Sequence, residues 1–76
     1  MYDRRQFLER QSAYWAEQAA WNNRMLTQYI DLARGYREMG REDIAAKIDE
    51  TAVIAMDLVV KCTEWSHADA EKAAAL

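Results

Sequence analysis

The chain lacks proline altogether and has only two glycines, Gly35 and Gly40, among its 76 residues. These two residue types interrupt helices most often, so nothing breaks a helix before residue 34 or within 42–75. Gly35 costs about 1 kcal/mol inside a helix and marks either an early fray or a close contact. The absence of breakers predicts an all-α chain.

Cysteine is nearly absent as well, since Cys62 is the only one. A disulfide within the chain is therefore excluded, and a reducing cytoplasm is the expected setting. We expect Cys62 to serve as a small buried hydrophobe rather than a reactive thiol.

Long apolar runs are missing too. The most apolar stretch, residues 52–60, is about half the length needed to span a bilayer, and Asp57 interrupts it. The polar start, Met1-Tyr-Asp-Arg-Arg, predicts no signal peptide. We expect a soluble cytoplasmic protein with no membrane partner.

There is no surplus of positive charge, because the formal net charge is −3. Binding to extended DNA or RNA requires such a surplus, so we do not expect it. Residues 1–40 carry six arginines against five carboxylates, and residues 41–76 carry four basic against eight acidic side chains. All basic residues of the first half are arginines, which suit phosphate or carboxylate ligands but also pairing between helices.

Gly40 is the best candidate for a turn, because it can adopt the left-handed conformation that follows a helix end. Glu42 and Asp43 then favour the first turn of the next helix through its dipole. We predict one domain, 1–76, with helix one at about 3–38, a turn near 39–41 and helix two at about 42–73. Such a hairpin is antiparallel, and residue i lies opposite about 80 − i, which places Trp15 near Trp65.

The apolar residues exceed what one hairpin can bury. Helix two carries a stripe spaced by three and four residues, and further apolar residues occupy its other sides. The stripe comprises Ile44, Ile48, Ala52, Ala55, Val59 and Cys62, and the remainder are Val53, Ile54, Met56, Leu58 and Val60. On helix one, Phe7, Tyr14, Trp21 and Met25 point one way, and Leu8, Trp15, Leu26, Tyr29 and Ile30 partly another. We therefore expect a homo-oligomeric helical bundle.

The interface between copies is expected to include Trp21, Arg24, Tyr29 and Asp57. Asp57 lies in the middle of the apolar belt, where an unpaired carboxylate would be very costly. It is expected either to form a buried pair with Arg24 that fixes the register or to line a polar ligand pocket.

Signatures of catalysis are absent, since the sequence has no Gly-rich phosphate loop and no nucleophile with an evident base. We therefore expect a protein that is not an enzyme and needs no cofactor. His67 stands three residues after Glu64, a spacing found in carboxylate-bridged di-metal bundles, and Glu17 lies near them in the expected register. A metal site at these residues is a minor alternative to solvated surface.

Aromatic residues gather in helix one and alternate with arginines, a combination that stacks bases and holds phosphates. It is equally typical of a core or of a protein interface. Trp21 is expected in the core, whereas Tyr14 and Trp15 fit either core or binding surface. The candidate ligand-binding residues are Arg4, Arg5, Arg10, Tyr14, Trp15 and Lys47.

One segment, residues 44–55, resembles the second long helix of small phage proteins that sequester cyclic oligonucleotides used in bacterial defence. The resemblance is carried by Lys47, Ile48, Glu50 and Ala55. It implies a small helical oligomer, cytoplasmic in the infected host, that binds cyclic nucleotides between protomers without altering them.

Two functions therefore compete. In the first, a homo-oligomer sequesters a nucleotide signal. In the second, a helical inhibitor or adaptor docks on a host protein, and its acidic second helix meets a basic surface. The acidic residues concerned are Asp49, Glu50, Asp57, Glu64, Asp69 and Glu71.

Overall fold

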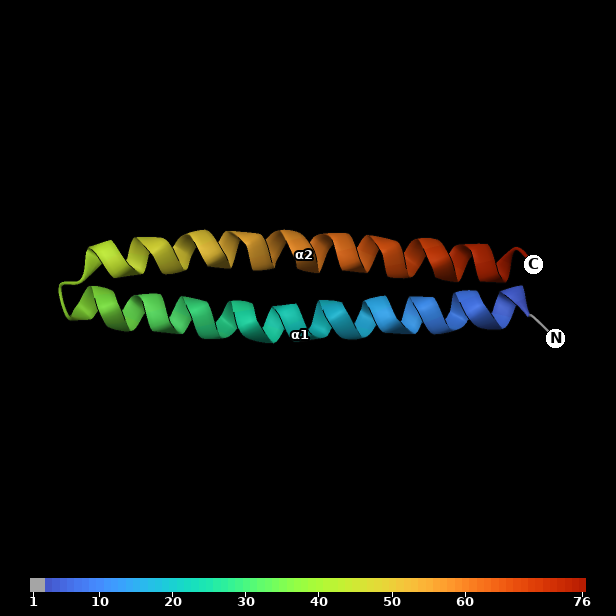
Figure 1. The fold of residues 1–76 in the computed structure, drawn as a ribbon, viewed down its shortest axis with the longest axis horizontal. Coiled ribbons are helices and arrows are strands. Elements are labelled where there is room, and N and C mark those ends of the chain that lie inside the picture. The colour runs from blue at the N-terminus through green and yellow to red at the C-terminus, as the bar shows by residue number, and fades with distance from the viewer. Residues whose placement is uncertain (1–2) are drawn as a thin grey trace.

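The computed structural model describes residues 3–76 and consists of two helices, α1 (Arg4–Glu38) and α2 (Glu42–Ala74). They lie side by side and antiparallel, with both chain ends at one end of the molecule and the turn at the other (Figure 1). The hairpin measures 58 × 14 × 14 Å between Cα extremes. The predicted helix bounds agree with the observed ones to within one residue.

Each end of α1 is capped by a local interaction. At the start, the Asp3 side chain accepts a hydrogen bond of 3.2 Å from the backbone N–H of Gln6. At the end, Gly40 has φ +77°, and the Arg41 N–H donates to the Tyr36 carbonyl at 2.8 Å. A left-handed glycine with this back-bond is the common way for a helix to stop, so the predicted role of Gly40 is confirmed.

The helix does not fray at Gly35, and no other segment packs closely against this glycine. α1 continues to Glu38, and apart from the neighbouring backbone of α1 itself no atom lies within 4 Å of the place where a Cβ on Gly35 would stand. Both roles expected for this glycine are wrong.

The turn is also held by an ion cluster centred on Arg37. Its guanidinium donates to Glu42, with Nε–Oε2 at 3.0 Å, and it also binds Asp49. Hydrogen bonding to Asp49, and then to Glu42, raises the pKa of Arg37 above its usual range. One side chain from the end of α1 thus holds the first two turns of α2.

Small residues fill the seam between the helices. The buried side chains of α2 recur at intervals of three, four and seven residues. They are Ala45, Ala52, Ala55, Cys62, Ser66 and Ala73, and they face Leu8, Asn22 and Ala33 of α1. The interval of 3.5 residues is that of a left-handed coiled coil. Ala52, Ala55 and Cys62 of the predicted stripe are buried, and Ile44, Ile48 and Val59 are half-buried.

The register of the hairpin is close to the predicted one. The rings of Trp15 and Trp65 meet with centroids 4.8 Å apart, as expected. Ser12 pairs with Ser66, two residues from its expected partner position. Ala33 and Ala45 are 1% and 0% exposed.

Replacing Ala45 by leucine should force the backbones of α1 and α2 apart. Overpacking a closed core position costs about 1–3 kcal/mol, so the midpoint of urea unfolding should fall clearly for Ala45→Leu. Ala46→Leu is the matched control, because Ala46 is the next residue along the chain and is exposed. Equal stability of the two variants would contradict a close seam at Ala45.

Candidate interaction surface

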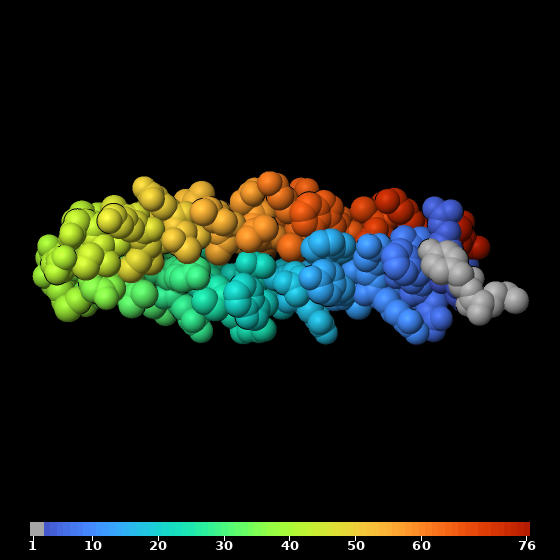
Figure 2. Space-filling model, in the orientation of Figure 1, coloured from blue at the N-terminus to red at the C-terminus, as the bar shows by residue number. Residues whose placement is uncertain are grey.

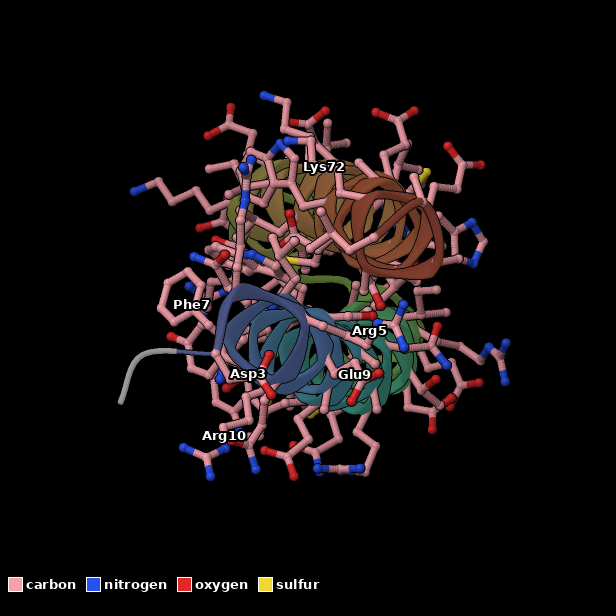
Figure 3. All side chains as sticks on the ribbon, turned by 90° about the vertical axis from the view of Figure 1, so that its right-hand side faces the viewer. Asp3, Arg5, Phe7, Glu9, Arg10 and Lys72 are labelled. Carbon is pink, nitrogen blue, oxygen red and sulfur yellow. The ribbon has the colours of Figure 1, made fainter. Side chains whose placement is uncertain are left out.

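One long side of the hairpin carries large apolar side chains from both helices. Phe7, Tyr14 and Trp21 follow one another at seven-residue intervals on α1, and Leu58 and Trp65 do so on α2. With Ile54 they form what we call the aromatic face. All six are 37–62% exposed. Phe7 marks this side in the end-on view of Figure 3, and the same side faces the viewer in Figure 2.

A shallow groove runs along the middle of this face. Its lining comes from both helices and consists of Trp21, Asn22, Met25, Tyr29, Thr51, Ile54, Ala55 and Leu58. The groove is almost wholly uncharged. Asn22 is the buried polar residue at the floor of the groove. Its Nδ2 donates a hydrogen bond of 2.8 Å to the Gln18 carbonyl of the same helix.

An aromatic cluster lies nearer the open end of the hairpin. Tyr14 and Trp15 meet edge-on with ring centroids 5.0 Å apart, and Trp15 packs on Trp65. A second hollow beside this cluster is lined by Gln11, Trp15, Trp65, Ala68, Asp69 and Lys72. Trp15 is half-buried, whereas Tyr14 belongs to the surface.

Trp21 does not belong to the core. Its side chain is 51% exposed, so the expectation of a core tryptophan is wrong for the single chain. The physical reason is the seam, where helices in contact through alanine leave no room for an indole. Tyr29 is half-buried at the edge of the groove, and Arg24 borders a recess beside Trp21.

The predicted pair between Asp57 and Arg24 is not formed. The Asp57 side chain is 58% exposed, and its Oδ2 accepts a hydrogen bond of 2.9 Å from Lys61 Nζ one turn further along α2. This contact raises the pKa of Lys61. Asp57 points away from α1 because it stands opposite the seam, so a buried pair across the hairpin is excluded.

Asp57 instead belongs to an acidic row, four of whose members are among the acidic residues that the sequence assigns to a basic partner surface. Every seventh residue of α2 is acidic along its outward side, and all of these residues are exposed: Asp43, Glu50, Asp57, Glu64 and Glu71. Helix two is therefore not apolar all round. A search for seven-residue spacing among the carboxylates would have found this row.

The six predicted ligand residues do not converge within one chain. Arg4 and Arg5 border a shallow depression with Asp3 and Leu76, while Arg10 points to another side of α1 than Arg5 (Figure 3). Lys47 stands near the turn, at the opposite end of the hairpin. At 1.5 Å rise per residue it is roughly 40 Å from Arg5.

The residues of the metal hypothesis are likewise not assembled. Within the described residues 3–76, no three His, Cys, Asp or Glu side chains lie close enough together to hold a metal ion. Glu17, Glu64 and His67 are all exposed in the chain.

Two serines form a polar contact in the seam that was not among the predicted features. Ser12 Oγ donates to the Ser66 carbonyl, and Ser66 Oγ donates to the Ser12 carbonyl, both at 2.8 Å. Reciprocal bonds of this kind require the two backbones to approach closely. The predicted register would have placed the two serines within two residues of each other.

No protein-family model, curated protein or solved structure matches the chain. Over residues 3–76, neither helix contains an apolar segment long enough to cross a membrane.

The serine pair yields a test of the seam. Ser12→Ala or Ser66→Ala alone should cost about 1 kcal/mol of unfolding free energy, because each removes a part-buried bond. The double variant should cost less than the sum of the two single losses, since the serines share one network. Urea unfolding of all four proteins measures the coupling. Strict additivity would show that the two hydroxyls act independently.

Proposed function

We propose that the protein is a non-enzymatic helical binding protein that works as a homo-oligomer, with the aromatic face as its self-association surface. The observation that carries this proposal is the exposure of six large apolar side chains on one side of a two-helix hairpin. A monomer rarely exposes so large a continuous apolar patch unless another molecule covers it.

The thin core supports the same proposal. Among residues 3–76 no large side chain is fully buried, and five of the seven buried apolar residues are alanines. A chain of this size has little buried area to offset its conformational entropy. Covering the aromatic face would supply the large side chains that the seam excludes.

For the external partner, we propose a host protein with a basic surface, to which the oligomer acts as an inhibitor or adaptor in the cytoplasm. The acidic row of α2 supports this partner, because it lies opposite the seam and stays accessible when the aromatic face is covered. Rows of like charge guide association with surfaces of opposite charge.

A second candidate function is sequestration of a cyclic oligonucleotide signal, as a phage anti-defence protein would perform it. The supporting observation is the cluster of Tyr14, Trp15 and Trp65, whose hollow also contains Lys72. Aromatic faces beside a cation can stack a base and hold its phosphate. Since Arg4, Arg5 and Arg10 diverge around α1, this site needs residues from more than one chain.

Self-association is tested by two neighbouring substitutions. Ile54 and Val53 are each 62% exposed, but only Ile54 lines the groove of the aromatic face. Ile54→Lys should shift the protein to monomer in analytical ultracentrifugation, because it places a charge in an apolar interface, whereas Val53→Lys should remain oligomeric. A monomeric wild-type protein at micromolar concentration would refute the proposal, and loss of the oligomer in Val53→Lys alone would refute the assignment of the face.

Ligand binding is tested by native mass spectrometry with a panel of cyclic di- and trinucleotides. If nucleotides bind at the aromatic cluster, whole ligands should add at fixed stoichiometry. Trp65→Ala should then weaken binding by about 1–3 kcal/mol, the worth of one stacked base. Val53→Ala is the control, because Val53 is exposed and lines neither the hollow of the cluster nor the groove of the aromatic face. An oligomer that binds none of these nucleotides would favour the protein partner. Capture of the oligomer on a basic protein surface then tests that partner.

A further inference from the structure

We propose that the aromatic face is covered by a second copy of the chain lying with its turn at the opposite end, so that α1 packs along the partner's α1. This inference rests on the proposed self-association and adds the arrangement of the two copies.

The dimensions of the face fit a second hairpin. The flank that carries the face is 58 Å long and 14 Å wide between Cα extremes, and the α1 residues of the face span about 21 Å of that length at 1.5 Å rise per residue. A partner that covers the whole flank would bury on the order of the 800 Å² that each side of a standard interface contributes. A copy of the chain is an elongated two-helix body of the same length and width. Face-to-face packing of two such bodies gives a four-helix bundle with an uncharged centre.

The charges beside the face fit a reversed copy of α1. The row bordering the aromatic residues reads Arg10, Glu17, Arg24 and Asp31, with seven residues between neighbours and alternating sign. Glu17 and Arg24 lie on either side of Trp21 and line one recess with it. An alternating row of this kind meets opposite charges when it is turned end to end.

Reversal about Trp21 gives definite partners. Glu17 stands four residues before Trp21 and Arg24 three after it, so Glu17 comes beside the partner's Arg24. By the same count, Arg10 comes beside the partner's Asp31. Tyr14 and Gln28 lie seven residues either side of Trp21, so the large ring meets a smaller amide.

The present state of these charges favours this arrangement. Within residues 3–76, Arg10, Glu17 and Arg24 form no ion pair, and Asp31 makes only a long contact of 3.9 Å with Arg34. With both turns at the same end, Glu17 would instead meet the partner's Lys61. Lys61 is already bonded to Asp57, so that arrangement offers Glu17 a cation that already has a partner.

The arrangement also determines where the acidic rows lie. Because α1 packs along the partner's α1, α2 packs along the partner's α2, and the two acidic rows come to the same edge of the bundle. Both rows face solvent at that edge, where salt screens their repulsion.

Charge exchange at the rim tests the arrangement. Glu17→Arg and Arg24→Glu should each weaken dimerisation roughly three- to tenfold, as expected for exposed ion pairs that occur twice by symmetry. The double variant should return the dissociation constant to near the wild-type value, because each pair is restored with reversed sign. Glu9→Arg makes the same change on the side of α1 that points away from the aromatic face (Figure 3), so it is the control and should leave the dissociation constant unchanged.

If the double variant dimerised as weakly as the single variants, the proposed arrangement would be overturned. That result is expected for turns at the same end, where an arginine at position 17 faces the partner's Lys61. Single variants without any effect would overturn it as well. A wild-type chain that stays monomeric would instead refute the proposed function, so the two failures are distinguishable.

A distance measurement gives an independent reading. In Cys62→Ala protein, a nitroxide attached at Arg41→Cys marks the turn of each copy. Turns at opposite ends should give a distance near the hairpin length of 58 Å by pulsed EPR. Turns at the same end would give only about two helix diameters, roughly 20–25 Å, and would overturn the proposal.

Discussion

The close approach of α1 and α2 along a line of alanines is the constraint on which the other features of this hairpin depend. Two helices can pack this near each other only where neither presents a large side chain, and Ala33 and Ala45 mark the closest packing with almost no exposed surface. The serine pair, Ser12 and Ser66, uses the same proximity for backbone hydrogen bonds. The seam thus selects small residues along α2 and at Ser12 and Ala33 of α1, while Leu8 is the one large buried side chain among residues 3–76.

This constraint determines where the large residues go. An indole or phenol that finds no room in the seam must lie beside it, and the aromatic residues of α1 accordingly line one flank. The half-buried Trp15 and Tyr29 lean over the seam, while Trp21 extends outward. A two-helix protein with a small-residue seam therefore carries much of its hydrophobic area on its outside, and that area is available for association.

The fold could be predicted from the sequence because its determinants are local. The absence of proline and the position of Gly40 define two helices and one turn, and the antiparallel register then brings Trp15 to Trp65. The seam residues were partly identified, since Ala52, Ala55 and Cys62 belong to a recognisable stripe. These inferences need only chain geometry and helical periodicity.

The side-chain environment was harder to predict, because burial depends on which residues occupy the narrow seam. Size and hydrophobicity alone predict a core position for Trp21, whereas alanine and serine occupy the seam and Trp21 is 51% exposed. Asp57 was misplaced for a related reason: its apolar neighbours in sequence point to other sides of α2. The arginines were grouped by type, although Arg5 and Arg10 point to different sides of one helix.

The two ends of the hairpin differ in how their contacts form. At the turn, Arg37 reaches residues only five and twelve positions away, whereas the contact of Ser12 with Ser66 closes a loop of 54 residues. Closing a short loop costs less entropy than closing a long one, so pairing should begin at the turn and proceed toward the chain ends. Opening then runs in reverse, and the aromatic cluster at the open end separates before the rest of the hairpin. A ligand or partner that contacts both Trp15 and Trp65 would therefore stabilise the closed hairpin at the end that opens most readily.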